Sequence, residues 1–218
     1  MRGNIAMRGR WLRTPPMFQH FPPIRSQEHR RHAGTGRFML LLLAVAGLGW
    51  WGWYRWDGDR RSHAYDAIIA EAARRQQISP YLVKAVIRQE SNFQRAARGR
   101  SGEIGLMQIM PGAIQDWEHA TGRNCQSLGM VFDPRLNIEI GTWYLSRAMN
   151  QWHDRPDQVI LALAQYNAGP GKVQKWVQSQ EAVGENPLDR IRIASTRTYI
   201  KNILRYRENY EKHQPQFQ

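Results

Sequence analysis

Helix-start signals recur along residues 65–212, where no stretch alternates polar and apolar residues for long enough to predict a strand. Ser79 and Asp133 each precede a proline, which is typical of a capping residue followed by proline at the first helical position. This part of the chain is therefore predicted to be all-α. The helices are expected at 65–77, 81–91, 111–120, 134–152, 156–166, 172–178 and 187–212.

An uncharged run of 17 residues, 38–54, precedes this domain. A helix of that length reaches about 25 Å, slightly short of the ~30 Å hydrocarbon core of a bilayer. Tryptophan and tyrosine crowd its C-terminal end, as aromatic side chains do at a membrane interface. We expect a single N-terminal transmembrane helix here, with a buried core helix and a cleaved signal peptide as the alternatives.

The basic charge of the chain is divided between two regions. The sequence has 31 lysines and arginines and 18 acidic residues, a net charge of +13. Residues 1–37 contribute eight arginines and one glutamate and show no apolar period, which predicts a disordered cytoplasmic tail. This tail lacks aromatic residues interleaved as stacking platforms and adjoins a membrane segment, so nucleic-acid binding is not expected.

These observations divide the chain into five parts. We expect a basic tail at 1–37, a membrane anchor at 38–54, a linker at 55–64, a helical domain at 65–212 and a short tail at 213–218. The single cysteine, Cys125, excludes an internal disulfide and a multi-cysteine metal site. The seven histidines show no ligand-like spacing, so neither a metal nor another cofactor is expected.

One acidic residue falls on the apolar face of the helix expected at 81–91. Glu90 comes four residues after Val86 and three after Ile87, so the helical period places its carboxylate among apolar side chains. Burial there raises the pKa of a carboxyl group towards neutrality, as a general acid requires. The alternative is a helix-end glutamate that reaches solvent or caps a neighbouring helix, and the spacing leaves both open.

Two further motifs contain polar residues among apolar neighbours. Residues 105–112 read GLMQIMPG, which places Gln108 in a short segment before a helix-starting proline. Residues 162–171 read ALAQYNAGPG, in which a helix ends in a turn that presents Tyr166 and Asn167. Each motif alone is also explained by core packing and turn formation.

Taken together, the motifs resemble the soluble lytic transglycosylase (SLT) domain, a lysozyme-like family that cleaves bacterial peptidoglycan. The Glu-Ser pair of the family matches residues 90–91, and its Gly-Leu-Met-Gln motif matches 105–108. Its Ala-Tyr-Asn-Ala-Gly motif matches 165–169, with Gln165 in place of the first alanine. Its Glu-Thr-Arg-x-Tyr motif matches 195–199, with Ser195 in place of glutamate. The resemblance covers residues 65–212 and implies a mostly helical, lysozyme-like catalytic domain.

The resemblance implies a single catalytic acid/base, Glu90. It protonates the glycosidic oxygen between N-acetylmuramic acid and N-acetylglucosamine, and then accepts the proton of the muramoyl C6 hydroxyl. That hydroxyl attacks C1 of the same sugar and leaves a 1,6-anhydro end, so no second enzyme carboxylate is needed. The positions implied to bind or surround the substrate are Ser91, Ser101, Gln108, Met110, Tyr166, Asn167 and Tyr199.

Two departures from the family pattern fall in the irregular segment 94–105, which contains three glycines and three arginines. Many members have a serine nine residues after the glutamate, where this chain has Gly99, and Ser101 is expected to replace it. Glu103 stands where a small residue is common. Its carboxylate either reaches solvent or acts as a second acidic group that favours hydrolysis.

Combined with the apolar run and the arginines that precede it, the resemblance predicts a periplasmic enzyme anchored in the bacterial inner membrane with its N-terminus in the cytoplasm. Its expected partners are glycan strands of peptidoglycan, the membrane and, by analogy, a secretion or conjugation apparatus. A lysozyme-type hydrolase and a non-catalytic glycan-binding or scaffolding module remain the alternatives.

Overall fold

The computed structural model describes residues 32–179, 186–214 and 217. The chain divides into two compact units, residues 1–49 and 50–218. Most of the predicted basic tail, 1–31, lies outside the described residues. Residues 32–37, expected to belong to that disordered tail, are helical, because helix α1 runs from His32 to His63. The predicted linker at 55–64 is also helical as far as residue 63.

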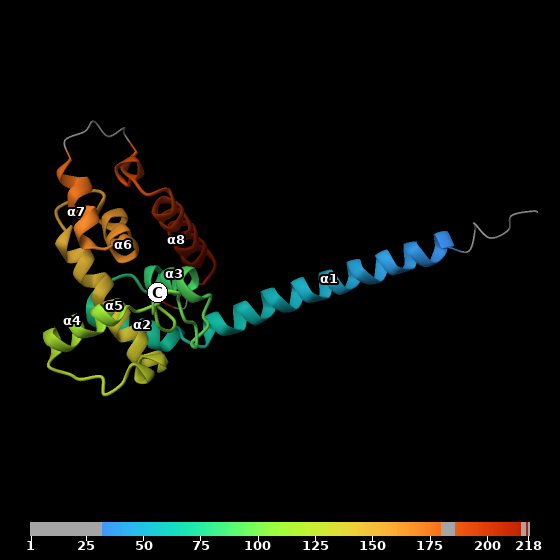
Figure 1. Cartoon of the computed structure of the whole chain (residues 1–218), viewed down its shortest axis with the longest axis horizontal. Helices are drawn as coiled ribbons and strands as arrows, with labels where there is room; N and C mark the ends of the chain where they lie inside the picture. The colour runs from blue at the N-terminus through green and yellow to red at the C-terminus, as the bar shows by residue number, and fades with distance from the viewer. Residues whose placement is uncertain (1–31, 180–185, 215–216, 218) are drawn as a thin grey trace, which may run out of the picture. The chain divides into compact units, whose positions relative to one another are not determined.

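The apolar run 38–54 lies within α1 (Figure 1). Its large apolar side chains between Phe38 and Trp51 are exposed, with Leu40 and Trp50 at 68% and 69%. Among the helices of the described residues, none combines the length and apolarity needed to cross a membrane, so the predicted span is not confirmed. The uncharged run has 17 residues, whereas about 20 are typical of a spanning helix.

The second unit is helical, as predicted, and its described residues form no strand beyond two isolated bridges in the loop before α4 (Figure 1). The proline signals mark helix starts correctly at Pro80, Pro111 and Pro134. The elements are α2 (Asp66–Gln76), α3 (Pro80–Ser91), α4 (Pro111–Thr121), η2 (Leu128–Phe132), α5 (Pro134–Gln151), α6 (Gln158–Ala168), α7 (Pro170–Gln178), η3 (Pro187–Arg190) and α8 (Ala194–His213).

Several predicted boundaries differ from the structure, as for the helix expected at 156–166, which occupies Gln158–Ala168. The single helix expected at 187–212 is divided into η3 and α8, because the backbone is extended at Ile191 and Ile193 between them. The helix expected at 172–178 begins two residues earlier, at Pro170, which is the first residue of α7. Gly169 has a φ of 88°, which turns the chain and lets proline occupy its favoured first helical position.

Helix α3 is the centre of the domain. Residues 81–87 are all buried, and the helix packs against α2 and α8. Even Lys84 is fully buried, where its Nζ donates to Asp66 Oδ1 of α2 at 2.6 Å and lies 5.1 Å from the ring centre of Tyr210 in α8. Glu90 therefore lies at the C-terminal end of a helix that is packed between α2 and α8.

Candidate active site

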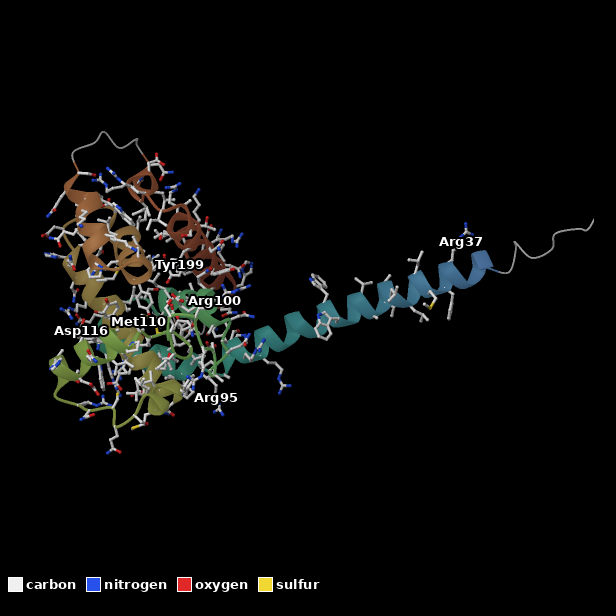
Figure 2. The ribbon with its side chains drawn as sticks, in the orientation of Figure 1. Arg37, Arg95, Arg100, Met110, Asp116 and Tyr199 are labelled. Carbon is white, nitrogen blue, oxygen red and sulfur yellow. The ribbon has the colours of Figure 1, made fainter. Side chains whose placement is uncertain are left out.

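A cleft of about 640 Å³ lies at the end of α3 and contains most of the predicted site residues. Helices α3, α4, α5 and α6 and the loop between α3 and α4 all contribute to its wall. Figure 2 labels Met110 of the loop and Asp116 of α4, which both line the cleft. The predicted residues found in the wall are Glu90, Ser101, Gln108, Met110, Tyr166 and Asn167.

The Glu90 carboxyl is partly buried at the wall of this cleft, as the helical period predicts. Its pKa is raised from 4.5 to about 7 as the net result of three effects. Burial raises the pKa most, the hydrogen bond from Tyr199 lowers it, and the negative charge of Glu103 adds a smaller increase. Near neutral pH such a group exists in both protonation states, so it can donate a proton and later accept one.

Tyr199 reaches the site from α8 and contacts Glu90 directly. Its hydroxyl donates to Glu90 Oε1 at 2.6 Å. Burial and the charge of Glu90 hold the pKa of Tyr199 well above its ordinary value of 10, so the phenol stays protonated and remains a donor. This hydrogen bond orients the carboxyl group and steadies its ionised form.

Tyr166 supports the opposite side of the cleft. Its hydroxyl donates to the carbonyl oxygen of Met107 at 2.8 Å, and its ring packs edge-on against Tyr144 with centroids 5.8 Å apart. Burial and the charge of Glu90 hold the pKa of Tyr166 well above 10. Tyr166 therefore connects α6 to the loop that carries Gln108 and Met110.

The loop itself is held by Asn137 of α5, a fully buried residue that the sequence analysis did not select. Asn137 Oδ1 accepts from the Met107 amide at 2.8 Å, and its Nδ2 donates to the carbonyls of Ile104 and Val131 at 2.9 Å. Gly105, with a φ of 75°, passes so close that a Cβ there would lie 2.4 Å from Asn137 Nδ2. The glycine of the Gly-Leu-Met-Gln motif is thus required by this contact.

Ser91 is the one predicted site residue that turns away from the cleft. It is 8% exposed, and its Oγ lies 2.8 Å from the carbonyl oxygen of Leu106 and 3.2 Å from that of Ile87. The first contact joins the end of α3 to the loop. The structure therefore places Ser91 behind the site, where it holds the loop against the helix that carries Glu90.

The Tyr-Asn-Ala-Gly turn is held by its neighbours. Asn167 lines the cleft, and its Oδ1 accepts from Thr196 Oγ1 of α8 at 2.8 Å. Gln165, which replaces the usual alanine, is buried; its Oε1 accepts from Trp152 Nε1 at 2.9 Å and its Nε2 donates to Gln151 Oε1 at 3.0 Å. The substitution is accommodated because both ends of the amide are bonded.

Ser101 and Glu103 occupy the loop rim of the cleft. Ser101 is exposed, and its backbone amide donates to Glu103 Oε2 at 2.9 Å. Glu103 was expected either to reach solvent or to act as a second acidic group. Its side chain is partly exposed and also lies in the same cleft as Glu90, so each alternative is partly correct. Asp116 and Tyr144 also line the cleft, and no sequence motif marks them because they come from separate helices.

Outside this cleft, the described part of the chain has a further hollow but no metal-binding cluster of side chains. Within the described residues, no group of three or more His, Cys, Asp or Glu side chains is arranged to hold a metal ion. A hollow of about 450 Å³ between α2, η2 and α5 contains none of the predicted site residues, and ion pairs such as Glu71 with Arg135 border it.

Comparison with known proteins identifies the family. Residues 67–188 match the model of the transglycosylase SLT domain, so the chain belongs to that family. The soluble lytic murein transglycosylase of Salmonella typhimurium is 34% identical over 162 residues, covering 71% of this chain and 24% of the relative. The membrane-bound lytic murein transglycosylase C of Shigella sonnei is 32% identical over 134 residues, covering 59% of this chain and 37% of the relative.

Solved structures agree with this assignment. An inactive mutant of lytic transglycosylase Slt from Pseudomonas aeruginosa superimposes with a TM-score of 0.62 at 31% identity, covering 68% of this chain and 24% of that one. A 70-kDa soluble lytic transglycosylase in complex with bulgecin A gives the same TM-score, identity and coverage. The chain spans about a quarter of the length of the soluble relatives, and the match concerns the helical domain.

Proposed function

We propose that this chain is a lytic transglycosylase that cleaves the β-1,4 bond between N-acetylmuramic acid and N-acetylglucosamine without adding water. The observation that carries the proposal is the Glu90 carboxyl, which lies in the cleft with a pKa raised to about 7. The names of the relatives, which are lytic murein transglycosylases, support peptidoglycan as the substrate.

The proposed reaction uses Glu90 twice. In the protonated state it gives its proton to the glycosidic oxygen, and the bond from that oxygen to C1 of the muramoyl sugar breaks. The resulting carboxylate then takes the proton of the C6 hydroxyl, whose oxygen bonds to C1 and closes the 1,6-anhydro ring. Tyr199, bonded to Glu90 Oε1, orients the carboxyl group and stabilises its ionised form between the two steps.

The test is digestion of purified sacculi followed by mass spectrometry of the released muropeptides. The wild-type protein is expected to release products that end in 1,6-anhydro-muramic acid. Glu90→Gln is expected to reduce that release by about 10³-fold or more, because the side-chain amide cannot act as an acid or a base. Glu208→Gln makes the same change at an exposed residue of α8 and is expected to leave release unaltered. Release of no muropeptides by the wild-type protein would favour a non-catalytic glycan-binding module.

A lysozyme-type hydrolase is the second candidate, and the presence of Glu103 in the cleft favours it. A second carboxylate allows a water molecule or a covalent intermediate to replace the C6 hydroxyl in the second step. The same digestion separates the two functions. Products with free reducing ends in place of anhydro ends identify the hydrolase.

We also propose the cellular setting that the sequence predicts: attachment to the inner membrane through the apolar run 38–54, with the catalytic domain in the periplasm. The exposed apolar side chains of this run support attachment. Fractionation of cells that express the full chain and a chain without residues 1–54 tests it, with the full chain expected in the membrane fraction. Co-purification with a secretion or conjugation apparatus is the corresponding test of that partner.

A further inference from the structure

The side chain of Glu103 covers the face of Gly99 where any other residue would place its Cβ. A Cβ built on Gly99 lies 2.0 Å from Glu103 Oε2, 2.5 Å from its Cδ and 2.8 Å from its Cβ. Contacts this short are not tolerated, so a side chain at 99 and the observed position of Glu103 exclude one another. The two departures from the family pattern are therefore one structural feature: the absent side chain at 99 leaves the space that the carboxylate fills.

The backbone holds Glu103 in this place. The Gly99 amide donates to the Glu103 carbonyl at 2.9 Å, and Gly102, with a φ of 95°, lets the chain turn between them. The Ser101 amide donates to Glu103 Oε2 at 2.9 Å. The turn thus folds the Glu103 carboxylate back over residue 99, and the Ser101 amide fixes one of the carboxylate oxygens. The backbone of the loop therefore determines where the carboxylate lies.

The Glu103 carboxylate is bonded by a backbone amide, that of Ser101, and not by a cationic side chain of the described residues. Among the described residues, no arginine or lysine forms an ion pair with it, whereas Asp116, the other acidic residue across the cleft, pairs with Arg147 at 3.5 Å. The titratable groups that face Glu90 are Glu103 from the loop, Tyr199 from α8 and Tyr166 from α6. Both tyrosines are neutral, so Glu103 is the acidic group that opposes ionisation of Glu90.

We propose that Glu103, seated over Gly99, is an electrostatic positioning residue of the cleft. Its negative charge adds to burial in keeping Glu90 protonated before the first step, and it favours positive charge on the sugar as the glycosidic bond breaks. The proposal rests on the function proposed above for Glu90. It assigns to the carboxylate the place in the cleft that a side chain at residue 99 would otherwise occupy.

The first test is the pH dependence of the rate on soluble, uncrosslinked glycan strands. Activity requires protonated Glu90, so kcat falls at alkaline pH as Glu90 ionises. Glu103→Gln removes the opposing charge, and the alkaline limb is expected to move roughly half to one pH unit towards acid, which is about a three- to tenfold loss of kcat near pH 7.5. Glu103→Asp keeps the charge and is expected to recover part of the loss, with KM changing little.

The second test moves the carboxylate without removing it. Gly99 is not in the left-handed region, so Gly99→Ala adds a clash with Glu103 and no backbone strain. Displacement of the carboxylate is expected to move the alkaline limb in the same direction as Glu103→Gln. In the Gly99→Ala background, Glu103→Gln is expected to have less than half of its effect in the wild-type background, because the charge has already moved.

Each outcome decides between explanations. An alkaline limb that stays in place in Glu103→Gln, or a loss of rate that is equal at every pH, would overturn the proposal and assign Glu103 a structural part in the loop. Glu208→Gln, measured beside it, should leave the limb in place. Failure of the proposed function is distinguishable, because the wild-type protein would then release no 1,6-anhydro product at any pH, whatever the effect of Glu103→Gln.

Discussion

The two walls of the cleft are built by different means. On one side Glu90 belongs to α3, a regular helix whose residues 81–87 are all buried. On the other side the loop of residues 92–110 has hardly any regular structure, and five of its residues have positive φ values: Asn92, Phe93, Gly102, Gly105 and Gln108. The helix keeps its residues in place through periodic packing. The loop buries non-periodic apolar side chains such as Leu106 and Met107, and its backbone is bonded by Asn137 and Tyr166 from helices later in the chain.

This difference has a consequence for mutations. A helix with neighbours on both sides distributes its stability over many contacts, so no single apolar contact decides where Glu90 lies. The irregular backbone of the loop also depends on individual polar and steric contacts at Asn137, Ser91 and Gly105, in addition to the burial of its apolar side chains. Substitutions at these three positions are expected to disturb the loop wall and to leave α3 folded.

The largest effect is expected from Asn137→Ala. It removes the side-chain partner of the Met107 amide and of the Val131 carbonyl, and one of the two donors to the Ile104 carbonyl, at a cost of about 3–5 kcal/mol in the free energy of unfolding. Chemical denaturation measures the cost, and muropeptide release should fall with it because the loop wall shifts. Asn150→Ala, at an exposed position of the same helix, is the matched control. Equal stability of the two variants would show that the loop does not depend on this residue.

The next-largest effect concerns Glu90 in the helix wall. Here the substitution is expected to increase the free energy of unfolding at alkaline pH and not to decrease it. Because the pKa of Glu90 is about 7 in the folded protein and 4.5 is its ordinary value, the folded state loses stability as pH rises from about 4.5 to 7. That loss amounts to at most about 3 kcal/mol, reduced by solvent at a partly exposed group. Glu90→Gln cannot ionise and therefore does not lose this stability. The variant should be more stable than the wild-type protein at pH 8 but not at pH 4.

Thermal unfolding at the two pH values measures this difference. Glu208→Gln, an exposed residue of α8, should unfold like the wild-type protein at both. A stability gain in Glu90→Gln that is equal at pH 4 and pH 8 would contradict the ionisation argument.

Gly105→Ala should have an intermediate effect on the loop wall. The new Cβ would lie 2.4 Å from Asn137 Nδ2, and the φ of 75° is unfavourable for alanine, so we expect a loss of about 2 kcal/mol in the free energy of unfolding. Gly102→Ala has a φ of 95° but open space around the new Cβ, so it separates backbone strain from the clash. If both variants lose equal stability, the contact with Asn137 is not what requires glycine at residue 105.

The smallest effect is expected from Tyr199→Phe. The hydroxyl of Tyr199 donates to the Glu90 carboxylate and lowers the pKa of Glu90, so its loss raises that pKa. The alkaline limb of kcat should move by up to about one pH unit towards higher pH, the reverse of the shift expected for Glu103→Gln. Tyr206→Phe on the same helix is the control, because Arg88 lies over its ring and phenylalanine keeps that contact. A limb that moves towards acid would show that Tyr199 does not stabilise the ionised form.

Local patterns predicted much of the fold and the helix wall. Helix starts at Pro80, Pro111 and Pro134 follow from capping chemistry that involves only neighbouring residues. The place of Glu90 on the apolar face of α3 follows from the helical period, which is equally local, whereas its partial burial became definite only in the structure. The division of 187–212 into η3 and α8 was not predicted, because no proline or glycine lies between the two elements to signal it.

What the sequence determined by itself is therefore the all-α class, the acid on α3 and the motifs that mark the cleft, because each depends on residues within a few positions of one another. Only the tertiary structure decided that Ser91 turns away from the cleft, that Asn137 holds a loop 30 residues earlier in the chain, and that Glu103 fills the space over Gly99. These contacts depend on how α5 and the loop of residues 92–110 pack against α3. Local periodicity contains no information about that tertiary packing.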